Sequence, residues 1–359
     1  MKEKGNSVVA LSWAIIYIFH VKALHQTYQQ STKAPELYGD YWFNSAPRSI
    51  ASSQGQNILL FFWSYTSPAS LRMLPIIQEW FTMYADLGLE CIGVHSPEFS
   101  FATNPRNVED FLQKHSVHFP IVADNDRLIA GAYRITTFPS LVLISGNGNI
   151  YDVVTETFSI SRLERSMQYL LRQSGFFGEL PMLRSIESER SQEHNAFEIT
   201  TGYLHGSLGN VEGYSPELPS EYRDPNIYVE GKFYAHGIWR AERNAFHYEG
   251  EPNDGYLICQ SEGENIDTLV GCEQKSSMRI KVDDASMLIG QMGSDVKRDP
   301  KGNSVVTINE PQFVSIFHGV QKETHSVKLI PANTGVTFYM FSLYKDRIQE
   351  DFDQTIHNN

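Results

Sequence analysis

One apolar run, Asn57 to Trp63, constrains the fold of this chain more than any other feature. An apolar run with polar residues at both ends predicts a strand buried on both faces of a sheet. A short loop follows it and ends in Ser67-Pro68-Ala69-Ser70, after which apolar residues recur with helical period from Leu71 to Leu87. The sequence therefore predicts a buried strand, a loop and a helix whose N-terminus lies near the end of that strand.

Strands and helices continue to alternate as far as Gln173. We expect strands at 89–94, 118–122, 140–145 and from Ile150, and helices at 108–115, around Ala130 and Tyr133, and at 161–173. A β-α order of this kind places helices on both faces of a central sheet. The first half of the chain therefore predicts an α/β fold.

The second half has a different pattern. Residues 175–195 mix glycine, proline and charged residues, as a linker does, and helical periodicity is lost beyond them. Short alternating runs between Gly, Asn and Asp turns are typical of an antiparallel β-sandwich. The expected strands are 226–230, 233–239, 255–260, 267–270, 277–282, 304–308, 313–318, 326–330 and 336–344.

Four motifs in the first half resemble those of a known family. In chain order they are Tyr41-Trp42-Phe43-Asn44-Ser45; Phe62-Trp63-Ser64-Tyr65 with Leu74-Pro75 after it; Ile92 to Phe99; and Phe119 to Asp126. Together they resemble the extracytoplasmic thioredoxin-like proteins of the TlpA and DipZ type. The second half is similar to the jelly-roll, carbohydrate-binding-module-like domain that follows the thioredoxin unit in DipZ-type proteins. The resemblance implies a thioredoxin-like fold followed by an all-β sandwich.

The N-terminus has the pattern of a secretory leader. Lys2 and Lys4 precede the mostly apolar run Val8 to Phe19, and Val21-Lys22-Ala23 has the small residues of a cleavage site. The run is short for a membrane span of about 20 residues, so a cleaved signal peptide is favoured over an uncleaved anchor. We therefore expect an extracytoplasmic protein, periplasmic or secreted, with membrane contact only through an uncleaved leader.

These expectations give five segments. They are a signal peptide or anchor at 1–23, a thioredoxin-like domain at 31–174, a linker at 175–195, a carbohydrate-binding-module-like sandwich at 196–346 and a polar tail at 347–359.

The family carries a Cys-x-x-Cys where this chain has Ser67 and Ser70. The resemblance implies that these are the positions of electron transfer in relatives. A serine hydroxyl stays protonated at physiological pH and forms no disulfide, so we expect no catalytic residue here. As nucleophiles the serines would need a base and an oxyanion hole, and no Gly-x-Ser-x-Gly elbow is present. Roles as N-cap and loop residues are favoured.

Aromatic residues around the tetrad suggest a binding surface. Trp63, Tyr65, Arg72 and Phe138 either form a shallow apolar patch that binds a peptide or belong to the core. Pro139 stands where the family keeps a cis-proline, whose loop offers backbone groups to an extended substrate peptide. We therefore expect an exported protein or peptide as partner.

Composition excludes several classes of ligand. With 42 acidic against 29 basic residues the net charge is −13, which argues against nucleic acid and against anionic lipid. His95, His115 and His118 lack the spacing of metal ligands, so we expect no metal and no cofactor. Cys91 heads a predicted strand and is expected to be an inert apolar filler.

Two cysteines in the second half leave a disulfide open. Cys259 and Cys272 fall on consecutive predicted strands around the turn at Gly263-Glu264-Asn265. In an oxidising compartment they would pair across that hairpin, although disulfide geometry is demanding.

The second half also holds aromatic residues that could stack on sugar rings, namely Tyr234, Trp239, Phe246 and Tyr248. Sandwich cores hold aromatics at the same spacing, and core is the favoured interpretation.

Three functions stay open. The first is a redox-inactive binding or scaffolding protein. The second is a thiol-disulfide oxidoreductase or antioxidant protein, in which Cys91 or a partner's thiol would do the chemistry. The third is a glycan-binding module that depends on the second half.

Overall fold

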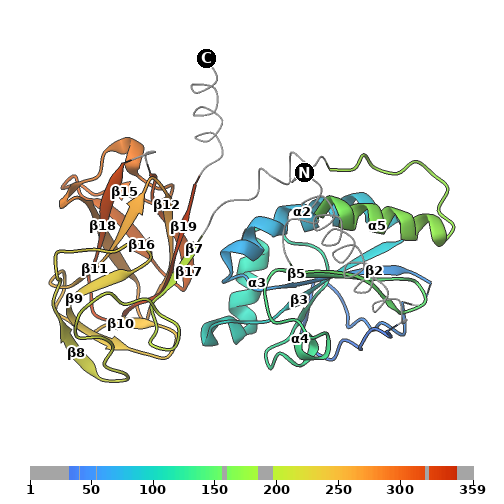
Figure 1. Cartoon of the computed structure of the whole chain (residues 1–359), viewed down its shortest axis with the longest axis horizontal. Coiled ribbons are helices and arrows are strands. Elements are labelled where there is room, and N and C mark those ends of the chain that lie inside the picture. The colour runs from blue at the N-terminus through green and yellow to red at the C-terminus, as the bar shows by residue number, and fades with distance from the viewer. Residues whose placement is uncertain are drawn as a thin grey trace, which may run out of the picture. The chain divides into compact units, whose positions relative to one another are not determined.

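The computed structural model describes residues 32–39, 41–53, 55–155, 160–184, 197–319 and 323–345. The chain divides into two compact units, Met1–Glu189 and Arg190–Asn359, and each is described by itself (Figure 1). The predicted signal peptide at 1–23 and the predicted tail at 347–359 lie outside the described residues.

The first unit is built on a six-stranded sheet in the order β1-β4-β3-β2-β5-β6. Its strands are β1 (Trp42–Phe43), β2 (Asn57–Trp63), β3 (Leu89–His95), β4 (Ile121–Ala123), β5 (Ser140–Ile144) and β6 (Ile150–Val154). Strands β2, β3 and β4 are parallel, whereas β1, β5 and β6 pair antiparallel with their neighbours. This is the expected thioredoxin-like α/β fold.

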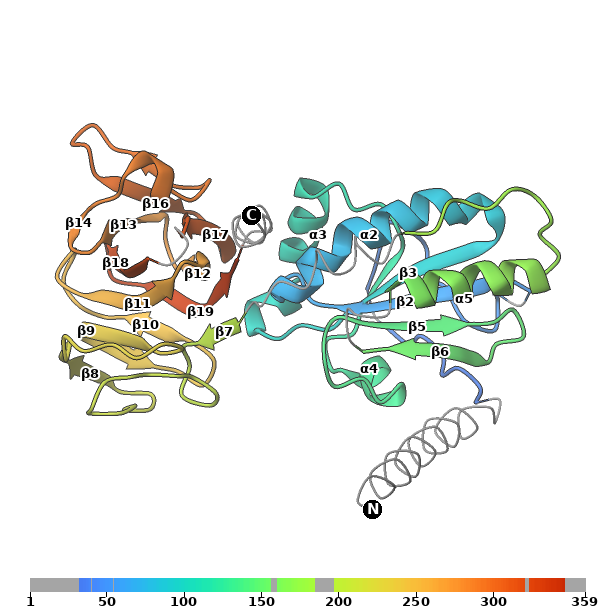
Figure 2. The same ribbon diagram turned by 45° about the horizontal axis from the view of Figure 1, so that its top comes forward.

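Helices cover both faces of this sheet (Figure 2). They are α2 (Pro68–Tyr84), continued by η1 (Ala85–Leu87), then η2 (Ser100–Thr103), α3 (Pro105–Lys114), α4 (Leu128–Ala132) and α5 (Ile160–Gln173). Leu59, Phe61 and Trp63 face the core under α2, α3 and α5, whereas the alternate residues of β2 face α4. Every residue of β2 is buried, as the apolar run predicted.

Residues 175–184, expected as the start of a linker, lie against the first unit. The buried carboxylate of Glu164 accepts hydrogen bonds from the Tyr84 hydroxyl at 2.8 Å and from the Arg184 backbone N–H at 2.9 Å. Gln168 donates to the Pro181 carbonyl at 2.8 Å, and Arg184 pairs with Glu79. The segment is therefore held to α2 and α5 by polar contacts that its glycine-rich, charged composition does not signal.

The second unit is an antiparallel sheet of 13 strands folded into two layers. Its strands are β7 (Phe197–Thr200), β8 (Pro219–Tyr222), β9 (Phe233–Ala241), β10 (Phe246–Tyr248), β11 (Tyr256–Glu262), β12 (Asn265–Cys272), β13 (Ser276–Val282), β14 (Ala285–Ser286), β15 (Lys297–Arg298), β16 (Ser304–Ile308), β17 (Gln312–Phe317), β18 (Thr324–Pro331) and β19 (Val336–Tyr344), with η4 at Ile289–Gln291. One hydrophobic core fills the space between the layers.

Strand β9 joins the two layers. Its first residues, Phe233 to His236, pair with β11, and its last residues pair with β8 and β10. Between them Gly237 has a φ of +93°, and a Cβ there would lie 2.9 Å from the Gly255 Cα. Glycine is needed at this point because the strand bends sharply and passes close to another backbone.

Several predicted strands need correction. Residues 226–230 form no strand, and Asn226 has a positive φ of 56°. Strands β7, β8, β10, β14 and β15 were not predicted, because each is only two to four residues long. Strands that are neighbours in the sequence also lie in different layers. β18 pairs with β11 and β13, whereas the next strand, β19, pairs with β7, β10 and β12.

Candidate functional site

The serine tetrad lies at the N-terminus of α2, directly after β2. Ser67 is the N-cap, and its hydroxyl accepts a hydrogen bond from the Ser70 backbone N–H at 3.3 Å. Pro68 occupies the first turn, where a missing N–H costs nothing. The Ser70 hydroxyl accepts from the Ser64 N–H at 3.4 Å, and both serines are buried. The two hydroxyls therefore serve the local backbone, in agreement with the favoured N-cap interpretation.

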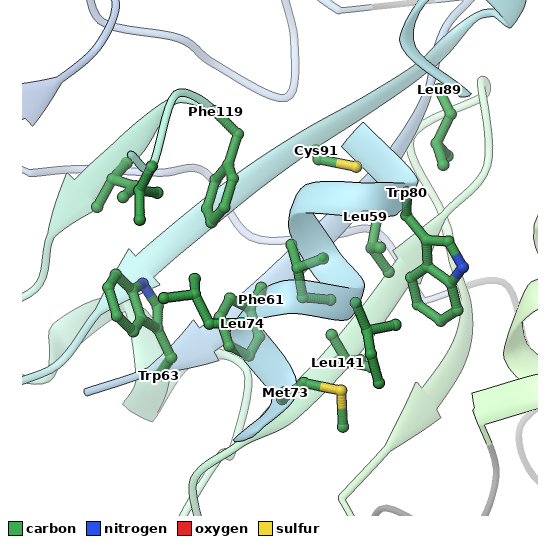
Figure 3. Packing of buried hydrophobic residues seen from close by; sticks show 14 of the residues in the cluster. Leu59, Phe61, Trp63, Met73, Leu74, Trp80, Leu89, Cys91, Phe119 and Leu141 are labelled. Carbon is green, nitrogen blue, oxygen red and sulfur yellow. The ribbon is translucent and has the colours of Figure 1, made fainter. Parts of the chain in front are cut away.

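Trp63 and Tyr65 do not line an open patch. Trp63 is fully buried and stacks on Phe61 with ring centroids 5.6 Å apart, and Figure 3 shows it packed beside Phe61 and Leu74. Tyr65 is 6% exposed and stacks on Phe111 at 5.1 Å. The sequence left open whether these side chains face a peptide or the core, and both rings lie in the core, packed against Phe111 of α3.

His95 lies at the end of β3, opposite Trp63 in the sheet register. Its ring stacks on Tyr65 at 5.3 Å and meets Trp63 edge-on at 5.5 Å. The side chain is fully buried, and neither ring nitrogen has a hydrogen-bond partner among the described residues. Burial lowers the pKa of His95 to about 3, so the imidazole is neutral at physiological pH.

The remaining predicted site residues, Arg72, Phe138 and Pro139, are half-buried. The Phe138–Pro139 peptide bond is cis, as the family resemblance implied. The guanidinium carbon of Arg127 lies 5.0 Å from the centre of the Phe138 ring and covers it. Of the five residues named for the patch, three are therefore half-buried and two lie in the core.

Cys91 is the thiol of the first unit, and it lies away from the tetrad. It pairs with Leu59 in the sheet, four positions before the Trp63–His95 pair, which corresponds to about 13 Å along the strand. Figure 3 shows its sulfur toward the Leu89 end of the core. Burial, with a smaller contribution from Glu90, raises the pKa of Cys91 to about 12. It is an inert filler, as expected.

Cys259 and Cys272 do not form the disulfide that the sequence left open, because both are free. Cys259 on β11 pairs with β9 and β18, whereas Cys272 on β12 pairs with β19. The two strands follow each other in sequence but belong to opposite layers, so they form no hairpin across which a disulfide could close. The Cys272 thiol donates to the Ile308 carbonyl at 3.2 Å.

The sandwich aromatics belong to its interior. Tyr234, Trp239, Phe246 and Tyr248 are each at most 2% exposed, so the core interpretation is confirmed.

Among the described residues no group of three His, Cys, Asp or Glu side chains could hold a metal ion. Of the helices in the described ranges, none combines the length and apolar character that crossing a membrane requires.

Sequence reasoning missed a cavity of about 430 Å³ in the first unit. Its walls come from residues 37–39, 41, 42 and 47 and from residues 123–126 and 128, two segments that lie far apart in the sequence. The cluster of aromatic residues Tyr38, Tyr41 and Trp42 in the sequence could have indicated a binding surface. The sequence does not indicate the pairing of β1 with β4, which brings the two walls of the cavity together.

Part of the first unit is similar to known proteins. Residues 32–153 match the AhpC/TSA family. Protein DipZ of Mycobacterium bovis is 27% identical over 228 residues, which cover 62% of this chain and 32% of DipZ. Thiol-disulfide oxidoreductase ResA of Bacillus subtilis is 26% identical over 121 residues, which cover 34% of this chain and 65% of ResA.

The chain thus spans about a third of the length of DipZ and just under two thirds of ResA. Among solved structures, a thiol-disulfide isomerase from Corynebacterium glutamicum is 22% identical with a TM-score of 0.36, over 38% of this chain and 96% of the isomerase. The expected relationship to TlpA/DipZ-type proteins is confirmed by the sequence matches.

Proposed function

Because residues 32–153 form a redoxin domain related to thiol-disulfide oxidoreductases, we propose that this chain is an exported, redox-inactive protein that binds a protein or peptide partner. The observation that carries the proposal is the use of both tetrad hydroxyls by the backbone. Ser67 accepts from Ser70, and Ser70 accepts from Ser64. The positions that hold the dithiol in relatives are built here into the start of a helix.

Thiol-disulfide exchange requires a thiolate that can reach a disulfide. The first unit offers only Cys91, which is 1% exposed, and burial keeps its thiol protonated at physiological pH. A partner's own thiol could still react, but nothing at Ser67 or Ser70 would form the mixed disulfide. The absence of thiol-disulfide exchange activity is therefore expected from the serines at positions 67 and 70 and from the burial of Cys91.

The binding part of the proposal rests on the loop before Pro139. Thr136 and Thr137 are exposed, and Phe138 and Pro139, which follow them, are half-buried, as is Arg72 on α2. An extended peptide that hydrogen-bonds to this loop would gain affinity from main-chain contacts and specificity from neighbouring side chains. Export is proposed from the leader pattern, and the mature protein should begin near Leu24.

The test combines an exchange assay with partner capture on the full chain. Insulin reduction by dithiothreitol should run no faster with the protein than without it. A captured partner should be released by denaturant without reductant, and Phe138→Ala should weaken its binding about tenfold or more. Tyr151→Ala, which removes an exposed ring on β6, is the matched control and should leave binding unchanged.

Two results would contradict the proposal. One is exchange activity that persists in Cys91→Ala and disappears in Ser67→Ala. The other is a partner that ignores Phe138→Ala and follows a fragment of the second unit.

A further inference from the structure

The cavity beside α4 has the features of a binding site separate from the tetrad. The geometry points to a site for an organic cation, an alkylammonium or guanidinium group, between Tyr38, Tyr41 and Asp126. Its volume of about 430 Å³ falls in the range of small-molecule sites. It opens where β4 ends, and the carboxyl ends of parallel strands are where α/β folds place ligands.

The walls of the cavity are fixed by hydrogen bonds. The Ala123 N–H donates to the Tyr41 carbonyl at 2.9 Å, and the Tyr133 hydroxyl donates to the Pro35 carbonyl at 2.6 Å. Gly39 packs so closely on β4 that a Cβ would lie 2.2 Å from Val122 Cγ2. The site is therefore preorganised, which lowers the entropy that binding would cost.

Aromatic and apolar side chains stand exposed around the cavity. Tyr38 is 80% exposed, Leu128 is 70% exposed and Tyr41 is 51% exposed, and Trp42 completes the lining. Large side chains this exposed and this close together mark a surface that binds something. Aromatic ring faces carry negative charge density and attract cations.

The charges of the lining decide which ligand fits. Asp124 is buried, and its carboxylate accepts from the Ile129 and Ala130 N–H groups and from the Ser96 hydroxyl, so it is committed to holding α4. Asp126 is exposed on the rim. Among the described lining residues none is basic, because the neighbouring Arg127 extends over Phe138 instead.

A carboxylate beside aromatic faces, in a protein of net charge −13, favours a cation over an anion or a neutral ligand. The cation could be a free small molecule or a lysine or arginine side chain presented by a polypeptide. Both sources share the same recognition chemistry.

The probes are tetramethylammonium and Nα-acetyl-arginine methyl ester, each with a neutral partner of similar shape, tert-butanol and Nα-acetyl-citrulline methyl ester. Binding to the full chain is followed by broadening of the ligand's own NMR resonances. We expect both cations to bind at least about tenfold more tightly than their neutral partners, with an affinity that falls as salt rises. A tetrapeptide with a single arginine and blocked ends has the same charge as the methyl ester. If it binds more tightly than the ester, the natural ligand is an arginine side chain of a polypeptide, and equal affinity indicates a free small cation.

Variants locate the site. Tyr41→Leu should weaken cation binding about fivefold, and Tyr41→Phe, which keeps the ring, should leave it within about twofold. Asp126→Asn should weaken it about threefold and reduce its salt dependence. Tyr151→Leu is the control at an exposed tyrosine on β6, and circular dichroism confirms folding of each variant. Equal binding of the neutral compounds, equal loss in Tyr151→Leu, or no saturable binding of either cation would overturn the proposal.

Discussion

Two places on the same edge of the sheet in the first unit use their side chains in opposite ways. At the end of β2, Trp63 and Tyr65 are buried and Ser67 is bound to the backbone. At the end of β4, Tyr38 and Tyr41 stand exposed around a cavity. The family motif therefore marks a position that this chain has filled with its own core, whereas the exposed side chains lie two strands away, at the end of β4.

Replacing both tetrad serines by cysteine should have the largest effect. The N-terminus of α2 favours negative charge, so a thiol at position 67 should have a lowered pKa and react as a thiolate. We expect Ser67→Cys with Ser70→Cys to reduce insulin about tenfold or more faster than the unmodified protein. Ser52→Cys, at an exposed serine away from any helix start, controls for a thiol of ordinary pKa. If the double variant reduces insulin no faster than Ser52→Cys, the N-terminus of α2 no longer lowers the pKa of a thiol at position 67 or no longer exposes that thiol.

Trp63→Ala tests the assignment of this ring to the core. Removing a fully buried tryptophan should lower the free energy of unfolding by about 3–5 kcal/mol. Phe138→Ala, at a half-buried ring, should cost clearly less and act mainly on partner binding. Chemical denaturation of both variants measures the difference. Equal stability losses would contradict the division into core and surface rings.

The sequence was sufficient for the α/β unit because its elements carry strong local signals. The apolar run of β2 and the helical period of α2 each reflect burial that one segment shows alone. In the sandwich, strand positions were largely predictable, but pairings were not. Strands β11 and β12 follow each other across a tight turn yet join opposite layers. That choice depends on where distant strands lie, so the cysteine pairing inferred from adjacency failed.

The candidate site shows the same limit. Motif spacing located Ser67 and Pro139 correctly at a helix start and a cis bond. It could not say which way Trp63 and Tyr65 turn, because that is decided by packing against Phe111 on α3. The two segments that line the cavity, with Tyr41 and Trp42 on one and Ala123 on the other, likewise meet through the pairing of β1 with β4, which the sequence does not indicate.

The buried imidazole of His95 predicts a pH dependence of stability. Its pKa is lowered in the folded state to about 3 from the ordinary value of 6.5, so above pH 6.5 the ring is neutral in both states and stability is full. Below pH 6.5 the unfolded chain binds a proton that the folded chain does not. The His95 contribution to the free energy of unfolding should therefore fall by about 1.4 kcal/mol per pH unit until the folded pKa is reached.

His95→Phe removes this titration while keeping an aromatic ring in the stack. The difference in unfolding free energy between the variant and the unmodified protein should be constant above pH 6.5 and should grow in favour of the variant between pH 6 and pH 4. Parallel pH profiles would mean that the ring is hydrated or paired, and that the end of β3 is more open than its burial indicates.

The smallest effect concerns the hydroxyl of Ser67 itself. Loss of an N-cap side chain costs about 1 kcal/mol, so Ser67→Ala should lower the free energy of unfolding by about that amount. Asn104→Ala is the matched control, because Asn104 caps α3 in the same way, accepts from the Arg106 N–H at 3.1 Å and also precedes a proline in the first turn. Ser67 is buried and Asn104 is exposed, so a lost acceptor at Ser67 leaves a donor that water reaches less easily. The loss at Ser67 should therefore equal or exceed that at Asn104. If Ser67→Ala leaves the free energy of unfolding unchanged while Asn104→Ala lowers it as expected, the Ser67 hydroxyl does not stabilise the start of α2. The backbone N–H groups there would then be available to a partner.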